Sequence, residues 1–165
     1  MDETQNMPSR RIEETVRLYA DMLFRICFVM LKNQSDAEDA VQNTFLKYIY
    51  KAPEFEAPEH EKAWLIRVAS NECKDMRRSS IRHSHTDITA VTDIQAGITD
   101  PESCGILEAL MDIPEKFRMV LILHYVEGYG VADIAKIIGK TGSAVKMRLQ
   151  KGRRLLEEKY RREYL

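Results

Sequence analysis

The stretch VADIAKIIGKTGSAVKMRLQ, residues 131–150, is decisive for the fold. Ala135 is small, Gly139 follows it by four residues, and Val145 follows the glycine by six. A helix-turn-helix needs a small residue where its helices cross, a residue that tolerates positive φ in the turn, and an apolar side chain between the helices. The spacing therefore predicts two helices, over about 131–138 and 142–160.

The second helix of this pair is rich in basic residues. Four of its side chains follow one another in steps of three and four, so they project from one face and can reach base edges, while two arginines lie nearer to phosphates. A basic surface helix with no ligand is the alternative interpretation. Gly152 costs about 1 kcal/mol relative to alanine inside a helix, and the sequence gives no functional reason for it. The candidate DNA-contacting residues are Lys146, Met147, Arg148, Gln150, Lys151 and Arg154.

Three more helices are expected in the first half of the chain. The first, over about 11–32, has apolar residues at alternating steps of four and three. The second opens at Ser35, because Ser35 and Glu38 form a capping-box signature. The third covers about 61–81, after a loop at 52–60 that contains two prolines. These three helices can share one core.

Residues 83–103 lack sustained periodicity and are rich in Thr, Ser and Asp, so we interpret them as a flexible acidic linker. A short helix at about 104–111 and another that starts at Pro114 follow it. The chain is therefore predicted to be all-α, with two small helical domains. The predicted boundaries are 1–82 for the first domain, 83–103 for the linker and 104–165 for the second domain.

Charge is unevenly distributed along these 165 residues, although the net charge is only -1. From Lys136 to the C-terminus there are ten Lys or Arg against three Glu, and Lys62 to Arg82 holds six Lys or Arg against two acids. Residues 84–115 contain seven acids and no Lys or Arg. The net charge thus hides two basic blocks, which keep nucleic acid among the possible ligands.

Several other classes of protein find little support. Three widely spaced cysteines and an N-terminus without an apolar leader predict a reduced, cytoplasmic protein, and no window is apolar enough to span a membrane. His83 and His85 have no third metal ligand at typical spacing. Because there is also no phosphate-binding loop and no nucleophile with a plausible base, we expect no enzymatic activity, metal, cofactor or small-molecule substrate.

At this point two sets of segments show a resemblance to a known family. The segments similar to sigma region 4 are DIPEKFR (112–118), YVEG (125–128), DIA (133–135) and VKMRL (145–149). Those similar to regions 2.2 to 2.4 are SDAEDAVQNTF (35–45) and AWLIRVASN (63–71), followed by Asp75, Arg77 and Arg78. The chain thus resembles the extracytoplasmic-function (ECF) group of the sigma-70 family, over about 11–82 and 104–162, with a short linker in place of region 3.

The resemblance implies a transcription initiation factor that binds bacterial core RNA polymerase and promoter DNA, and that an anti-sigma factor regulates. It assigns reading of the minus-35 element to the helix-turn-helix. The residues that it assigns to core polymerase binding are Asp36, Asp39, Gln42 and Phe45. Those that it assigns to the minus-10 element are Asn71, Lys74, Arg77, Arg78 and Trp64.

Two alternatives stay open at this stage. Phe45 and Trp64 each have a structural interpretation, as core residues of their helices, beside the functional one. The whole chain has an alternative function too, that of a helix-turn-helix regulator that binds DNA without polymerase. DNA binding in the absence of polymerase would distinguish it from a sigma factor.

Overall fold

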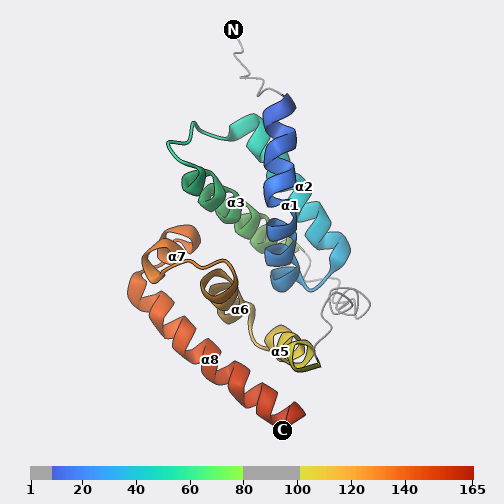
Figure 1. Ribbon diagram of the computed structural model, residues 1–165, viewed down its shortest axis with the longest axis vertical. Helices are drawn as coiled ribbons and strands as arrows, with labels where there is room; N and C mark the ends of the chain where they lie inside the picture. Colours follow the sequence, from blue (N-terminus) through green and yellow to red (C-terminus); the bar gives the residue numbers. More distant parts are fainter. Residues whose placement is uncertain (1–8, 80–100) are drawn as a thin grey trace. The chain divides into compact units, whose positions relative to one another are not determined.

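The computed structural model describes residues 9–79 and 101–165, which form two compact helical units (Figure 1). We call them the N-terminal unit and the C-terminal unit. The prediction of an all-α chain with two helical domains is confirmed. A helix begins at Pro101, so the last three residues of the predicted linker are helical, whereas 83–100 lie outside the described residues. Within the described ranges, no helix is both long and apolar enough to cross a membrane.

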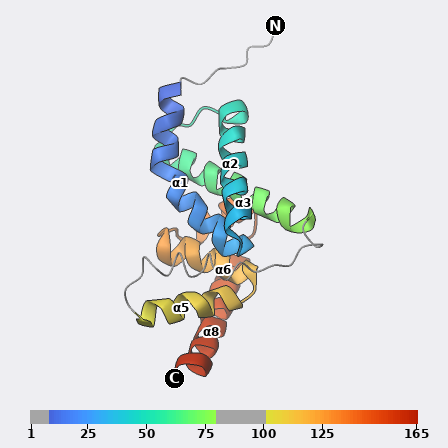
Figure 2. The same ribbon diagram turned by 90° about the vertical axis from the view of Figure 1, so that its right-hand side faces the viewer.

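Three helices make up the N-terminal unit, and each packs against the other two (Figures 1 and 2). Their contact buries apolar side chains of all three helices, including most of the stripe that the sequence predicts on the first. The helices are α1 (Ser9–Leu31), α2 (Gln34–Lys51) and α3 (Pro58–Ser79). The largest side chains that the core buries completely or nearly so are Leu23, Ile26, Phe28, Met30, Tyr48, Leu65 and Ile66.

A two-residue turn joins α1 to α2. Lys32 has a φ of 55° and its backbone N–H bonds to the carbonyl of Phe28, so it ends α1 in the left-handed conformation that glycine usually supplies. Asn33 then caps α2, with its side-chain oxygen accepting from the backbone N–H of Asp36 at 2.9 Å. The predicted capping box at Ser35 is therefore wrong: α2 starts at Gln34, and Glu38 bonds to the Gln34 side chain at 3.1 Å.

The third helix starts earlier than the sequence suggests. It begins at Pro58 rather than at about residue 61, because proline suits the first helical position, where its missing N–H costs nothing. Glu59 and Glu61 lie in the first turn, where a negative charge interacts favourably with the helix dipole. The loop between α2 and α3 is therefore shortened to 52–57.

The C-terminal unit is arranged around one long helix, α8 (Gly142–Tyr164), which packs against the three other α-helices within residues 101–165. The preceding elements are α5 (Pro101–Asp112), α6 (Glu115–Leu121), the π-helical turn η1 (Ile122–Val126) and α7 (Val131–Ile138). The predicted bounds of α7 are confirmed, whereas α8 continues four residues beyond the predicted end. The core side chains with no exposed surface include Val120, Leu123, Ile134 and Val145.

Candidate nucleic-acid and partner interfaces

The helices α7 and α8 form the predicted helix-turn-helix. Gly139 ends α7 with a φ of 67°, as the turn requires, and Thr141 caps α8 by accepting from the N–H of Ala144 at 3.1 Å. Val145 is completely buried and Ala135 is 9% exposed. The three residue types that suggested the motif therefore occupy the positions at which its geometry needs them.

One side of α8 carries the exposed candidate residues. Lys146, Met147 and Gln150 are exposed, and Met147 keeps 70% of its surface accessible. Arg154 is also exposed, one to two turns farther along the helix, whereas Arg148 is half-buried. A helix with donors, an apolar side chain and cations on its accessible side is suited to the major groove of DNA, which presents acceptors, methyl groups and flanking phosphates.

Two of the candidate DNA-contacting cations on α8, Lys151 and Arg154, have partners within the unit. The Nζ atom of Lys151 lies 5.6 Å from the ring centroid of Phe117, so this lysine is drawn toward α6. Arg154 lies with its Nε atom 3.9 Å from Glu158 Oε1, in a pair in which both side chains are exposed. Exposed pairs contribute little and are screened by salt, so a phosphate can replace Glu158 at small cost.

The buried side of α8 explains Gly152. Its position is buried, and an added Cβ would lie 3.3 Å from the Cβ of Phe117 and 3.3 Å from Leu121 Cγ. The absence of a side chain therefore lets α8 approach α6 closely. The sequence shows only the cost of this glycine, because the close approach is a property of the tertiary structure.

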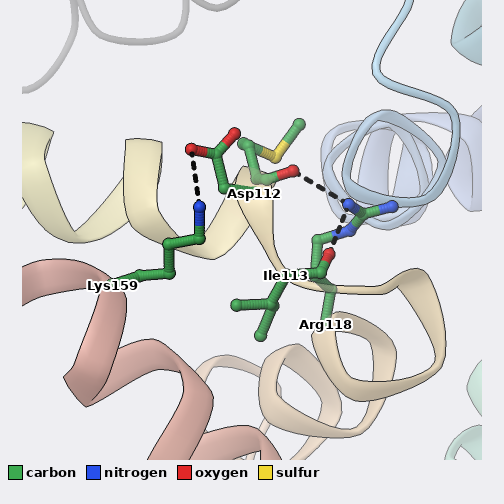
Figure 3. Close-up of polar contacts among 5 residues, drawn as sticks. Asp112, Ile113, Arg118 and Lys159 are labelled. Carbon is green, nitrogen blue, oxygen red and sulfur yellow. Dashed lines mark hydrogen bonds and ion pairs between the residues drawn. The ribbon is translucent and has the colours of Figure 1, made fainter.

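A buried arginine that the sequence does not single out joins α5 to α6. Arg118 is 3% exposed, and its Nη1 atom donates to the carbonyls of Met111 at 3.0 Å and Ile113 at 2.8 Å (Figure 3). Carbonyls at the end of a helix lack intrahelical donors, so the guanidinium completes the C-terminal end of α5. Lys159 of α8 approaches Asp112 at the same place, with Nζ 3.9 Å from Oδ2 (Figure 3).

Polar contacts also fix the segment between η1 and α7, directly before the helix-turn-helix. His124 Nδ1 lies 2.8 Å from the carbonyl oxygen of Tyr129, and its ring packs edge-on against Tyr125. Tyr125 in turn accepts a hydrogen bond from Arg153 Nη1 at 3.0 Å, which links η1 to α8. This hydrogen bond therefore helps to fix α8, the second helix of the helix-turn-helix, relative to η1.

Helix α3 presents the second group of candidate residues. Asn71, Arg77 and Arg78 are exposed, and Lys74 is half-buried. Asn71, Lys74 and Arg78 lie on the side of α3 away from the stripe of Leu65, Ala69 and Cys73 that faces the core. Arg77 follows Cys73 by four residues, so it lies on the side of that stripe, and it is exposed in the last turn of the helix. The structure thus brings an amide and two cations together on the outer surface of α3, with a third cation in its last turn, a composition suited to a nucleic-acid backbone and base edges.

Trp64 belongs to an aromatic cluster inside the N-terminal unit. Its ring centroid lies 6.2 Å from that of Tyr48 and 5.9 Å from that of Phe55, in edge-on contacts. Tyr48 and Phe55 are stacked with their centroids 6.5 Å apart. The cluster joins α2, α3 and the loop between them, so the structural interpretation of Trp64 accounts for its position.

Tyr48 adds a polar connection to this cluster. Its hydroxyl donates to Glu61 Oε1 in the first turn of α3, and Thr15 Oγ1 of α1 lies 3.2 Å from the same hydroxyl. Burial raises the pKa of Tyr48 above its ordinary value of 10.0, and the hydrogen bond to the Glu61 carboxylate raises it further. The neutral phenol therefore joins all three helices of the unit.

The outer face of α2 contains the third group. Asp39 and Gln42 are exposed and Asp36 is half-buried, but Phe45 is only 9% exposed and lies in the core. Two apolar side chains that the sequence analysis does not select, Leu46 and Tyr50, are 48% and 70% exposed on this helix. Their spacing of i+7 and i+11 from Asp39 places all three on one face, and this pattern is a signal that could have identified them.

Among the described residues, no group of three or more His, Cys, Asp or Glu side chains is arranged to hold a metal ion. His83 and His85 lie outside the described residues. The fold and the three exposed faces instead define a two-domain helical protein of the helix-turn-helix, DNA-binding class.

Comparisons with known proteins identify the family. The sigma-70 region 2 family matches residues 15–83, and the sigma-70 region 4 family matches residues 105–156. The chain belongs to the ECF group of the sigma-70 family of RNA polymerase sigma factors. It is accordingly a transcription initiation factor and not an enzyme.

Two curated relatives come from Bacillus subtilis. The ECF RNA polymerase sigma factor SigW is 26% identical over 90% of this chain and 88% of its own length. The RNA polymerase sigma factor SigV is 27% identical over 86% of both chains. Among solved structures, the sigma factor RpoE from Bartonella quintana, in complex with the anti-sigma factor NepR, is 22% identical and superimposes with a TM-score of 0.72, covering 93% of this chain and 99% of the other.

Proposed function

We propose that this chain binds bacterial core RNA polymerase and directs it to promoters through two separate DNA contacts. The observation that carries the proposal is that the candidate faces lie on two separately folded units, matched in order by sigma-70 regions 2 and 4. A regulator that binds DNA alone needs only the helix-turn-helix. Such a regulator would leave the exposed faces of α2 and α3 without a role, whereas a sigma factor uses them to bind polymerase and the minus-10 element.

Helix α2 is the proposed polymerase contact. Asp36, Asp39 and Gln42 supply hydrogen-bonding groups, and the exposed side chains of Leu46 and Tyr50 supply apolar surface on the same helix. Interfaces commonly combine an aromatic or aliphatic anchor with a polar rim. Phe45 supports this face from within the core.

The surface of α3 is the proposed contact for the minus-10 element. Arg77, Arg78 and Lys74 provide the positive charge that tracks a single strand, and the amide of Asn71 offers a donor and an acceptor for a base edge. Trp64 has a structural part in this proposal, because its contacts with Tyr48 and Phe55 hold the first half of α3 against α2 and the loop between the two helices.

Helix α8 is the proposed contact for the minus-35 element. Lys146, Met147 and Gln150 are placed to reach base edges, whereas Arg148 and Arg154 are placed for phosphates. Lys151, held over Phe117, lies at the margin of this contact.

Regulation by an anti-sigma factor, in the cytoplasm, is part of the proposal. Support comes from the similar sigma factor RpoE, which was solved in complex with the anti-sigma factor NepR. A second similar structure, with a TM-score of 0.70, contains CnrH in complex with the cytosolic domain of CnrY. An anti-sigma factor would compete with polymerase for the exposed faces of this chain.

The test is binding to bacterial core RNA polymerase followed by transcription. The full chain is used to pull down core enzyme, and the resulting holoenzyme is given a promoter library randomised across both elements. The variant Asp39→Ala with Gln42→Ala is expected to bind core enzyme at least about tenfold more weakly, because it removes two polar contacts of an interface. The matched control, Glu13→Ala with Asp21→Ala, changes exposed residues of α1 and should bind like wild type.

Two results would contradict the proposal. One is the absence of core binding by the wild-type chain, together with tight sequence-specific DNA binding by the chain alone, which would identify a polymerase-independent regulator. The other is equal core binding by the double variant and wild type, which would remove α2 from the interface.

A further inference from the structure

Met147 is an unusual residue for its position. With 70% of its surface accessible, it is the one large apolar side chain that is exposed among the described side chains of α8. Its accessible neighbours on this side are polar: Ser143, Lys146 and Gln150 are all exposed. With this exposure, packing against the described residues of its own unit does not explain an apolar side chain here.

The orientation of Met147 follows from the opposite side of the helix. Val145 and Leu149 are 0% and 4% exposed and hold α8 against the core, and Gly152 brings the same side close to α6. Successive residues of an α-helix are rotated by about 100°, so Met147 lies about 160° around the helix from both Val145 and Leu149. Its side chain therefore projects away from the C-terminal unit, and core packing fixes this direction.

Met147 is also close to the end of the helix that reads DNA in this motif. It is the sixth residue of α8, in the second turn after the Thr141 cap. In a helix-turn-helix, the N-terminal residues of the second helix contact base edges in the major groove. Lys146 beside it and Arg154 farther along supply positive charge for the phosphates that border the groove.

A thioether side chain favours contact with an apolar group of a base over contact with a group that needs a strong hydrogen bond. Base edges in the major groove present donors, acceptors and one apolar group, the 5-methyl group of thymine. Methionine is flexible and polarisable, so it adapts to a methyl group without strain, but its thioether sulfur is only a weak acceptor for the amino group of adenine or cytosine. A base with only polar groups at this position would be desolvated by Met147 without compensation.

We infer that Met147 is a specificity-determining residue, which reads the 5-methyl group of a thymine in the upstream promoter element. The inference rests on the proposed function, because it assigns a base preference to the contact between α8 and DNA. It also predicts that this element contains a thymine whose methyl group, rather than its hydrogen-bonding edge, is recognised.

The experiment separates the methyl group from the rest of the base. Holoenzyme made with the full chain selects its upstream element from the randomised library, and each thymine of that element is then replaced in turn by deoxyuridine, which lacks only the methyl group. Wild-type holoenzyme should bind about fourfold more weakly when one particular thymine is replaced, since burial of one such group contributes about 0.8 kcal/mol. All measurements use one salt concentration.

Two variants change the protein side of the proposed contact, as deoxyuridine changes the DNA side. Met147→Gln has a similar length but a polar end, and it should bind thymine and deoxyuridine promoters equally. Met147→Leu remains apolar and should keep most of the fourfold preference for thymine. Because the side chain is exposed, neither variant is expected to alter folding, and the far-ultraviolet circular dichroism of both should match wild type.

The outcomes distinguish this inference from the proposed function. If holoenzyme enriches no upstream element, the proposed function fails and the inference falls with it. If an element is enriched but no deoxyuridine replacement weakens binding, or wild type and Met147→Gln lose equally, the inference alone is overturned. In that case an apolar protein partner becomes the better explanation for Met147.

Discussion

Asn33 stabilises the start of α2 through a single hydrogen bond between its side chain and the N–H of Asp36. We expect Asn33→Ala to lower the free energy of unfolding of the N-terminal unit by about 1 kcal/mol, the usual loss for an N-cap. Urea unfolding followed by the fluorescence of Trp64, the single tryptophan of the chain, measures it, because this residue packs against Tyr48 of α2 in the same unit.

Two controls test the assignment of this cap. Asn33→Asp keeps an acceptor oxygen and should unfold at nearly the same urea concentration as wild type. Ser35→Ala changes the residue that the sequence pattern favours as the cap, but the structure places Ser35 on the exposed side of α2. A loss of stability for Ser35→Ala with none for Asn33→Ala would reverse our assignment.

Gly152 is needed where α8 passes close to α6. The mutation Gly152→Ala would gain about 1 kcal/mol from helix propensity at an exposed site. Here the new Cβ would lie 3.3 Å from the Cβ of Phe117, which the backbone holds in place. Overpacking of this kind costs about 1–3 kcal/mol, so we expect a net loss of about 1 kcal/mol. Amide hydrogen exchange in α6 and α8 reports the stability of this unit.

Gly142 provides a matched control in the same helix. A Cβ on Gly142 would meet only Val131 Cγ1, at the ordinary contact distance of 3.8 Å. Gly142→Ala should therefore be neutral or slightly stabilising. Slower exchange in both variants would show that α8 and α6 can separate to accommodate a side chain at Gly152, contrary to the proposed close contact.

At the scale of whole elements, the hydroxyl of Tyr48 connects α2 to Glu61 of α3 and Thr15 of α1. Burial, reinforced by Glu61, raises the pKa of this phenol above 10.0, so the folded state favours the neutral form. The associated stability is complete below pH 10 and is lost as the pH rises above it. We expect wild type to lose up to about 1.4 kcal/mol per pH unit more than Tyr48→Phe in this alkaline range.

The measurement is urea unfolding followed by Trp64 fluorescence at a series of pH values from neutral to alkaline. At neutral pH, Tyr48→Phe should cost about 1–2 kcal/mol, since it removes the partner of Glu61. Burial also raises the pKa of Tyr19, with Glu61 as a second cause, so the variant should keep part of the alkaline loss. Tyr50→Phe, on the exposed face of α2, should unfold like wild type, and identical alkaline losses in Tyr48→Phe and wild type would contradict the prediction.

A structural feature of these helices can be predicted from the sequence when the interactions that produce it are between residues close together in the chain. The apolar stripes of α1 and α8 could be predicted because helical periodicity alone places Leu23 or Val145 on an inner face. The turn at Gly139 could be predicted because few other residues accept its φ. The burial of Arg118 could not, since its acceptors are carbonyls at the end of α5 and in the turn that follows it, and helical periodicity does not describe that turn.

The candidate sites show the same division. The exposed residues of α8 followed from the helix-turn-helix pattern, since the buried side of a helix defines the accessible one. Phe45 and Leu46 are neighbours in sequence, but the packing of α2 buries the first and exposes the second. The spacing of Leu46 from Asp39 separates the two, but the resemblance that assigned Phe45 to the polymerase contact does not use this spacing.

At the scale of the whole molecule, the charge of a single helix differs strongly from the net charge of the chain. The net charge of the chain is -1, but α8 alone carries eight Lys or Arg against three Glu. The Debye length at physiological ionic strength is about 8 Å, so a phosphate responds to cations near it and not to acids elsewhere in the chain. DNA binding by α8 is therefore compatible with a nearly neutral protein.

If the cations of α8 bind phosphates locally, the salt dependence of promoter binding should change when one of them is removed. Each phosphate that a cation neutralises releases counterions, so Arg154→Ala should reduce the slope of log K against log salt concentration by about 1 and weaken all promoter sequences equally. Arg10→Ala provides the control, because it removes the same charge from an exposed site on α1. If net charge governed binding, the two variants would behave alike in holoenzyme binding measured across a series of KCl concentrations. If local charge governs it, as the structure indicates, only Arg154→Ala changes the slope, and an unchanged slope would exclude Arg154 from the phosphate contact.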